Sequence, residues 1–495
     1  MKWIALALFL LAIPALVAWL RTNPRSAPLV WGLLGFLPFV LGPWHLMVAP
    51  YATPIWSGYV KGWEISLLDT VALGIIFGTR ERWPRLTLVV PFVLYILAVT
   101  FAVSQARFAA LALSYPIQLC RAFLVFIAVT RVAVHERGER AVFTGLVLGL
   151  LVQAGYAITA KAGGALQTGG SLGHQNLLGF VSHLAVMPAF AMFLAGRFPR
   201  TAFTGVIAGI LCVILTASRA TIALSFLGLA VTLLLSLSLR FSGRKAALGL
   251  AGALVLLVAY PLANIVLEQR LTAHKQTFFA EDKERTAFER AARAMIRAEP
   301  MGVGPNHYVF IANTEGYSAK AGVAWRSESR STSVHNSYLL VTAETGFAGL
   351  ITFLALIGCA IWAAFRTAFR YRKYQASELL IGVGCGIVTM SIHGLFEWMF
   401  VVYPTQYVLA VGFGIIGGLR ARFMAAAAKD QGAKGGSRRG PRKPGKGPRP
   451  AAVAGLPEVP ELALAQSQTR TTIAFHTPGK GRGDLLDKTR NGRSR

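Results

Sequence analysis

Residues 220–239 read ATIALSFLGLAVTLLLSLSL and contain no charged side chain. About 20 consecutive apolar residues are needed for an α-helix to span the roughly 30 Å hydrocarbon core of a bilayer. The stretch therefore predicts a transmembrane helix. Similar runs recur along the chain, and the full set of predicted spans is 3–20, 29–49, 65–78, 86–104, 111–134, 141–160, 174–195, 201–217, 220–239, 247–267, 338–365, 377–399 and 403–423.

The number of these runs defines the class of protein. The chain has 495 residues, of which 54% are hydrophobic and only 14% are charged. A soluble protein of this length cannot bury so many long apolar runs. The sequence therefore predicts an all-α polytopic membrane protein with about 12–13 transmembrane helices. The short run 65–78 is the weakest of them.

Basic loops predict the orientation of the spans. The formal net charge is +29, and short loops rich in Lys and Arg stay in the cytoplasm. Three such loops, each two crossings from the next, are Arg197 with Arg200, Arg240 with Arg244 and Lys245, and Arg366 with Arg370, Arg372 and Lys373. Alternation then places Arg219 and the polar segment 268–337 on the outer side of the membrane.

The C-terminal segment has a different composition. From Arg420 onward it holds 17 Lys/Arg against 5 Asp/Glu, a net charge of +12, and Gly and Pro are frequent over 431–450. Such a segment cannot bury a core, so we expect a disordered cytoplasmic tail. It either touches anionic lipid or is a solvated segment that only fixes orientation. No recognised binding motif accompanies its basic residues, so nucleic acid is not an expected partner.

The segment 268–337 is the long polar connection between spans, and long loops are often functional. Residues 284–299 have strong helix-forming composition. At 100° per residue, Phe288, Ala291, Ala292, Met295 and Ile296 share one face, and Arg290, Arg293 and Arg297 share another. The pattern predicts an amphipathic helix that lies along the membrane surface and ends at Pro300.

His335 is the first candidate for chemistry. It opens the stretch His335-Asn336-Ser337 at the boundary between the polar segment and a span. Histidine accepts a proton near neutral pH, so it is suited to be a general base for a polar acceptor. The structural alternative is an interfacial histidine, with Asn336 or Ser337 capping the following helix.

Two arginines give His335 a chemical context. Arg219 stands at the outer mouth of a span, where a charge is costly, and Arg285 begins the amphipathic helix. Arginine binds phosphate oxygens through a rigid fork of donors, so the pair points to a diphosphate-bearing lipid. The alternatives are an interfacial anchor for Arg219 and a solvated helix face for Arg285.

The remaining candidates are weaker. His174 and Asn176 lie at the outer end of another span and are expected to line the same cavity. His393 and Glu397, four residues apart, predict either a two-ligand metal site or a packing pair on one helix. The chain has no Asp-x-Asp sequence, so we expect arginine rather than a metal ion to balance the diphosphate, and no cofactor.

These residues together resemble the O-antigen ligase and polymerase family of bacterial surface-glycan assembly. Its ligases carry His, then Asn, Ser or Gln, then nine residues, Gly, two residues and Gly, which His335-Asn336 through Gly346 and Gly349 match. Arg285, a helix and the run 300–305 (PMGVGP) are similar to the family's Arg, helix and Pro-x-x-Gly-x-Gly sequence. Ser218-Arg219 and the stretch 173–176 (GHQN) resemble further family segments, with Gln175 where proline is common.

The resemblance implies a GT-C-like membrane glycosyltransferase of the bacterial inner membrane with its site at the periplasmic face. It implies a metal-independent, inverting transfer of a glycan from undecaprenyl diphosphate, with His335 as general base and Arg219 and Arg285 on the diphosphate. His174, Asn176, Asn336, Arg290 and Arg293 are the expected substrate-binding residues. The acceptor is lipid A–core for a ligase, which the His335 motif favours, or a second lipid-linked glycan for an O-antigen or exopolysaccharide polymerase.

An alternative hypothesis, from another class of protein, is a transporter of the lipid-linked glycan. Transporters commonly show internal repeats and helices broken at the membrane midplane, and no convincing repeat occurs in this chain. The expected organisation has four parts: an N-terminal transmembrane bundle (1–267), a periplasmic catalytic loop (268–337), C-terminal transmembrane helices (338–424) and the basic cytoplasmic tail (425–495).

Overall fold

The computed structural model describes residues 2–79, 83–252, 254 and 275–437, and side chains are described there except over 275–282 and 431–437. The first part of the chain contains α1 (Lys2–Thr22), α2 (Ala27–Phe36), η1 (Leu37–Phe39), β1 (Met47–Ala52), β2 (Gly62–Ser66), α3 (Leu67–Gly78), α4 (Val89–Ala102), η2 (Val103–Gln105), α5 (Ala109–Ala112), α6 (Ser114–Ala133) and α7 (Glu136–Ala162). The central part contains α8 (Gln175–Ala195), α9 (Pro199–Leu215), α10 (Arg219–Leu239), α12 (Lys275–Ala298), α13 (Tyr308–Thr314), α14 (Tyr317–Lys320) and α15 (Ser327–Arg330). The last part contains α16 (Ser337–Arg370), α17 (Ser377–His393), η3 (Met399–Val401) and α18 (Tyr403–Ser437).

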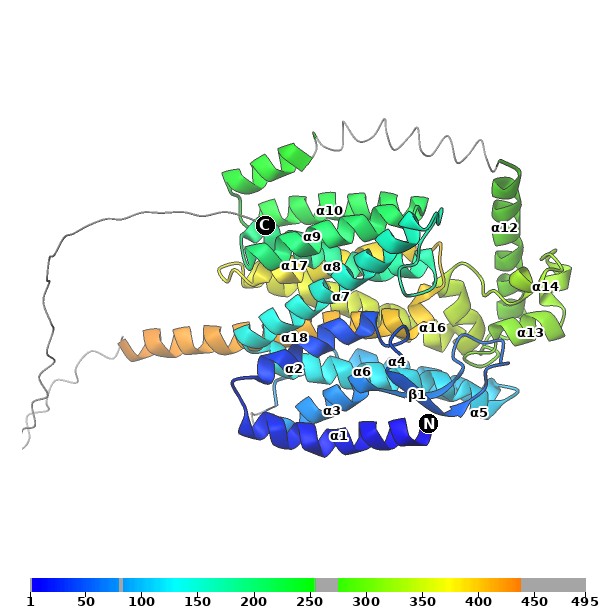
Figure 1. The fold of residues 1–495 in the computed structure, drawn as a ribbon, viewed down its shortest axis with the longest axis horizontal. Helices are drawn as coiled ribbons and strands as arrows, with labels where there is room; N and C mark the ends of the chain where they lie inside the picture. The colour runs from blue at the N-terminus through cyan, green and yellow to red at the C-terminus, as the bar shows by residue number, and fades with distance from the viewer. Residues whose placement is uncertain (1, 80–82, 253, 255–274, 438–495) are drawn as a thin grey trace, which may run out of the picture. The chain divides into compact units, whose positions relative to one another are not determined.

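The prediction of an all-α polytopic membrane protein is confirmed. Within the described ranges, seven helices are long and apolar enough to cross a membrane: Lys2–Thr22, Ala109–Ala133, Glu136–Ala162, Gln175–Ala195, Arg219–Leu239, Ser337–Arg370 and Tyr403–Asp430. Five shorter apolar helices accompany them: Ala27–Phe39, Leu67–Gly78, Val89–Gln105, Pro199–Leu215 and Ser377–His393. Figure 1 shows that most of these helices run along one common direction, whereas α12 crosses that direction at one end of the bundle.

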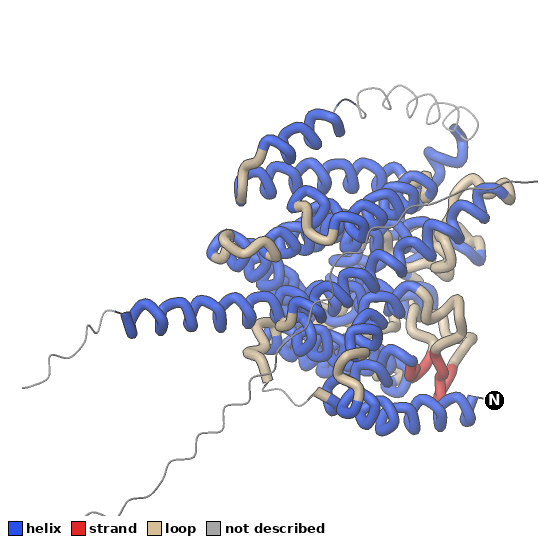
Figure 2. The backbone as a smooth tube through the Cα atoms, turned by 60° about the vertical axis from the view of Figure 1, so that its left-hand side comes forward, coloured by secondary structure: helices blue, strands red, loops and turns tan. Residues whose placement is uncertain are grey.

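Several predicted boundaries differ from the structure. The run 29–49 is not one helix, because α2 and η1 end at Phe39 and the chain then enters the antiparallel β1–β2 hairpin. That hairpin lies at the same end as the N-terminus (Figure 2). The run 377–399 ends at His393, and α18 continues to Ser437, past the expected start of the tail at 425. Most of the predicted span 247–267 and the tail from 438 lie outside the described residues.

The basic loops meet at one end of the bundle. Nη2 of Arg240 donates to the carbonyl of Tyr374 (3.0 Å), and Nη2 of Arg244 donates to the carbonyl of Phe193 (3.2 Å). Nε2 of Gln375 donates to the carbonyl of Ala195 (2.9 Å). The loops predicted to share one side of the membrane therefore lie together, at what we call the basic end.

The opposite end, which we call the site end, holds the first turns of α8, α10 and α16. The α16 helix begins there at the N-cap Asn336 and is bent at Gly346, whose φ of 65° and ψ of −172° are accessible essentially to glycine alone. Side chains of α8 and α10 approach closely near their starts, since a Cβ added at Gly179 would collide with Thr221. This contact brings the starts of α8 and α10 together.

A buried carboxylate fixes the polar segment onto this end. Oε2 of Glu344 accepts hydrogen bonds from the backbone N of Asn306 (2.9 Å) and from the hydroxyl of Tyr59 (2.6 Å). Oε1 of Glu344 accepts from the backbone N of Tyr308 (2.9 Å). The Asn306 side chain pairs in turn with the backbone of Val60, with both hydrogen bonds at 2.9 Å. The polar segment is thus held between the hairpin region and α16.

Candidate functional site

The site is built around the carboxylate of Glu397. This residue follows α17 in a short turn and is only 2% exposed. Its position is set through the backbone, because the hydroxyl of Ser337 donates to the carbonyl of Glu397 (2.6 Å) and the amide of Ser337 donates to the carbonyl of Gly394 (2.8 Å). The turn after α17 is therefore tied to the first residue of α16.

Three side chains from separate elements meet this carboxylate. Nδ2 of Asn176 donates to Oε1 of Glu397 (2.6 Å), and Nη2 of Arg285 donates to the same oxygen (3.3 Å). Nδ1 of His335 lies 3.2 Å from Oε2 of Glu397. The first turn of α8, the middle of α12 and the residue before the α16 cap thus converge on one group.

The electrostatics of the cluster keep Glu397 charged. Burial raises the pKa of the Glu397 carboxyl, but the hydrogen bond and charge of His335, together with Arg285, outweigh burial and lower the pKa from its ordinary value of 4.5. An ionised carboxylate only accepts hydrogen bonds, so Nδ1 of His335 must donate. In a neutral imidazole, Nε2 of His335 is then left as the proton acceptor.

His335 is supported on its other side by α12. The predicted apolar face of that helix is confirmed, since Phe288, Ala291, Ala292 and Met295 are buried. The ring of Phe288 lies 5.9 Å from the ring of His335, measured between centroids. The His335 side chain remains 21% exposed, so it is oriented by packing while still open to a ligand.

The other predicted residues at this end are His174 and Arg219. His174 is the N-cap of α8, and its Nδ1 accepts from the amide of Asn176 (3.2 Å). Desolvation lowers the pKa of His174. The charge of Glu397 raises this pKa and that of His335 lowers it, so His174 interacts electrostatically with both residues. Arg219 is the first residue of α10, beside the start of α8.

Three further predicted residues make contacts away from the Glu397 carboxylate. The Asn336 oxygen accepts from the amides of Tyr338 (3.0 Å) and Leu339 (3.1 Å), so Asn336 caps α16. Arg293 is exposed and pairs with Glu289 at i,i+4 (3.2 Å). Arg290 is also exposed and points toward Gly322. The structure does not bring Arg290 or Arg293 to Glu397.

The expectation of His393 and Glu397 on one helical face is wrong. The α17 helix ends at His393, and the following turn directs Glu397 to His335. His393 instead lies 3.0 Å from Nε2 of the buried His183 through its Nδ1. No group of three or more His, Cys, Asp or Glu side chains suited to a metal ion occurs within the described ranges.

The class of protein is now defined: a multi-pass, all-α membrane protein with a polar cluster of a histidine, an arginine and a buried carboxylate at one end of its helices. Residues 204–354, about a third of the chain, match the family described as O-Antigen ligase. This match supports a glycan-processing ligase or polymerase in general. Arg219, Arg285 and His335 fall inside the matched segment, whereas Asn176 and Glu397 lie outside it. A comparison with curated proteins finds no match.

Proposed function

We propose that the chain is a membrane glycosyltransferase that moves a glycan from undecaprenyl diphosphate to an acceptor hydroxyl at the periplasmic face. The observation that supports this most is the meeting of His335, Arg285 and Asn176 at the carboxylate of Glu397. A base held in one tautomer beside a permanent cation suits a reaction that removes a proton and releases an anion.

In the proposed reaction, Nε2 of His335 accepts the proton of the acceptor hydroxyl as its oxygen attacks the anomeric carbon. The bond between that carbon and the diphosphate oxygen breaks, and undecaprenyl diphosphate leaves with the electron pair. Attack opposite the leaving group inverts the anomeric configuration. The proton then passes from His335 to water, which restores the base.

Each remaining residue has a separate task in this scheme. Arg285 and Arg219 bind the diphosphate and stabilise the charge that develops as it leaves. Glu397 holds the Nδ1 proton of His335 and stabilises the imidazolium, as the carboxylate does in a Ser-His-Asp triad. Asn176 fixes the other oxygen of Glu397. Arg290 and Arg293 have no contact with the diphosphate in this proposal.

The preferred acceptor is lipid A–core, which makes the chain an O-antigen ligase, and the His335-Asn336 motif favours this choice. The alternative is an O-antigen or exopolysaccharide polymerase that uses a second lipid-linked glycan. We place the site end in the periplasm and the basic end in the cytoplasm of the inner membrane, since the three basic loops lie together.

A deletion strain separates the possibilities through its surface glycan. A ligase leaves bare core with polymer accumulating on undecaprenyl diphosphate, whereas a polymerase leaves core capped by a single repeat. A transporter instead leaves the donor on the cytoplasmic leaflet. Complementation with His335→Ala should fail, and normal surface glycan in that strain would contradict the assignment of His335 as the base.

A further inference from the structure

A second site lies at the basic end, far from the Glu397 cluster. A cavity of about 770 Å³ is enclosed by the end of α1, the start of α2, the end of α3 and the start of α7. Its volume lies in the range of small-molecule sites, about 300–1,000 Å³. Phe198, which also lines it, follows the C-terminal end of α8, whereas Asn176 of the Glu397 cluster lies in the first turn. Since a helix rises about 1.5 Å per residue, the length of α8 separates the two sites by about 30 Å.

An apolar groove adjoins this cavity. It has a volume of about 580 Å³ and runs between α2 and α7. Leu29 on one wall is 75% exposed and Leu148 on the other is 47% exposed, so the groove opens on the outer surface of the helices. In a membrane-spanning bundle such a surface contacts lipid chains.

The cavity and the groove share two arginines. Arg137 and Arg140, one turn apart on α7, line both spaces, and Arg21 also lines the cavity. Arg137 and Arg140 are exposed and have no ion-pair partner within the described ranges. The acidic residue in the cavity, Glu136, is paired with Arg197 (3.0 Å). Among the described residues, the junction therefore carries more positive charge than neighbouring carboxylates balance.

Trp31, which lines the cavity, carries a hydrogen-bond donor that has no partner among the described residues. Nε1 of Trp31 is buried and unpaired among the described residues, and Trp31 lines the cavity. Its ring stacks on His135 with 6.3 Å between ring centroids and 18° between planes, which holds the indole in place. An indole N–H only donates hydrogen bonds, so it needs an acceptor such as a phosphate oxygen.

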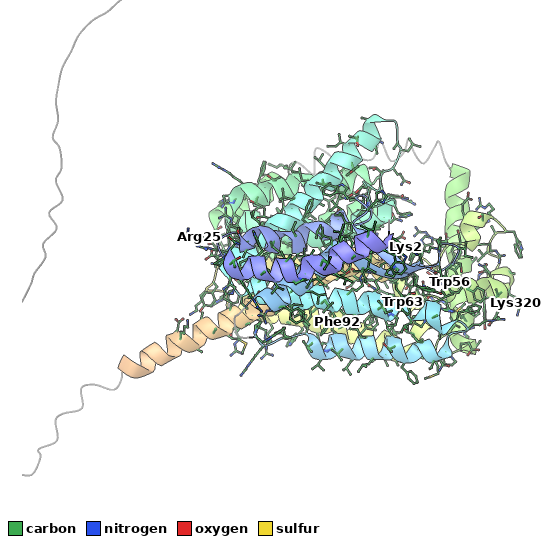
Figure 3. The ribbon with its side chains drawn as sticks, turned by 60° about the horizontal axis from the view of Figure 1, so that its bottom comes forward. Lys2, Arg25, Trp56, Trp63, Phe92 and Lys320 are labelled. Carbon is green, nitrogen blue, oxygen red and sulfur yellow. The ribbon has the colours of Figure 1, made fainter. Side chains whose placement is uncertain are left out.

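The exposed Arg25 extends the basic surface next to the cavity, in the loop between α1 and α2. Figure 3 shows Arg25 at the end of the helices opposite Trp56 and Lys320. Trp56 contacts Asn306 of the polar segment through Nε1 (3.0 Å), which identifies that other end as the site end. Basic pockets between transmembrane helices on the cytoplasmic side bind the head groups of anionic lipids.

We propose that the junction of cavity and groove binds one anionic glycerophospholipid, with its phosphate on Arg137, Arg140 and the Trp31 N–H and an acyl chain in the groove between α2 and α7. This site is independent of glycosyl transfer at the other end of α8. It fits a diacyl lipid better than free phosphate, because the charged and apolar parts of the site are continuous.

The test uses the full chain, delipidated and returned to phosphatidylcholine nanodiscs, with phosphatidylglycerol titrated in and binding measured by native mass spectrometry. Near a membrane surface each basic residue contributes about a fivefold change in affinity, so Arg137→Gln with Arg140→Gln should weaken binding about 25-fold. Trp31→Phe keeps the ring and removes the donor, and should weaken binding without changing net charge. Glycerophosphate, which lacks acyl chains, should not displace the lipid.

The matched control is Arg366→Gln with Arg370→Gln, two exposed arginines of α16 that do not line either space. This control should bind phosphatidylglycerol as the unmodified chain does. The proposal is overturned if both double variants lose phosphatidylglycerol binding equally. It is also overturned if the unmodified chain retains phosphatidylglycerol and phosphatidylcholine equally. If the Arg137 and Arg140 double variant has a lowered melting temperature in phosphatidylcholine nanodiscs, the Trp31→Phe variant is the deciding test. Unchanged phosphatidylglycerol binding by Trp31→Phe then rejects the proposed site.

Discussion

Nδ1 of His335 lies 3.2 Å from Oε2 of Glu397, although 62 residues separate them in the chain. The contact forms because Ser337, two residues after His335, binds the carbonyl of Glu397 through its hydroxyl (2.6 Å). The hydrogen bond from Ser337, the first residue of α16, therefore also places Glu397 beside the imidazole. Because the other carboxylate oxygen is held by Asn176 and Arg285, Glu397 has little freedom to turn away.

Glu397→Gln is expected to slow glycosyl transfer by about 10²–10⁴-fold, the range that general acid–base catalysis contributes, because it removes the carboxylate that orients the base. An amide presents one acceptor and one donor group, so it cannot accept from His335, Asn176 and Arg285 together. The rate is measured with purified chain and lipid-linked donor. Glu289→Gln, on the exposed side of α12, is the control and should keep the full rate. A Glu397→Gln rate within about twofold of the unmodified chain would remove the orienting role.

Arg285→Ala is expected to lower the transfer rate by about 10²–10³-fold, if it stabilises the leaving diphosphate as an oxyanion-hole donor stabilises its intermediate. Arg293→Ala on the same helix is the matched control. It removes an equal charge from an exposed position that, within the described ranges, pairs with Glu289 alone, so it should change the rate little. Equal effects of the two substitutions would mean that α12 contributes general charge and that Arg285 has no specific contact.

Much of this site follows from the sequence, and the reasons differ by residue. His335 was predicted because it stands at a boundary between a polar and an apolar stretch, and Arg285 because it begins the amphipathic helix. The buried face of α12 was predicted because helical periodicity is local. Asn336 as a cap was the stated alternative, and the structure bears it out.

Glu397 was missed because its position depends on where α17 ends. Continuing the helix through 399 placed it beside His393, on a helix face directed elsewhere. No proline follows His393 to predict the end of the helix, and Gly394 is the one local residue that indicates a helix end. The stop is decided by long-range contacts of Ser337 with the carbonyls of Gly394 and Glu397, which no local pattern contains. The end of the helix at Phe39 and the start of β1 at Met47 were not predicted, because the run 29–49 is predominantly apolar.

The stability of the chain should fall with acidity below about pH 4.5, in part through Glu397. The folded-state pKa of this carboxyl is lowered, so its ionised form stabilises the fold above the ordinary value of 4.5. That contribution is lost as the pH falls through the lowered folded-state pKa. Thermal melting in nanodiscs from pH 7 to pH 3 measures it. Glu397→Gln should show a smaller loss than the unmodified chain over the acidic range, and identical slopes would contradict the linkage.

Gly346→Ala should destabilise the chain and release the polar segment from α16. At φ 65° and ψ −172° a residue with a Cβ is strained by about 1–3 kcal/mol. The added Cβ would also lie 2.6 Å from the carbonyl carbon of Met301 and 2.7 Å from the carbonyl oxygen of Pro300, so the loop that follows α12 has to move.

Gly358→Ala is the matched control, since it lies in the same helix and an added Cβ meets nothing within 4 Å. Replacing a helical glycine by alanine there should leave stability unchanged or raise it by up to about 1 kcal/mol. Melting temperature reports the strain, and limited proteolysis over 299–336 reports the loop. Transfer activity should fall for Gly346→Ala alone, because Arg285 and His335 flank the displaced loop. If both variants melt and cleave alike, the bend at Gly346 is not what holds the polar segment in place.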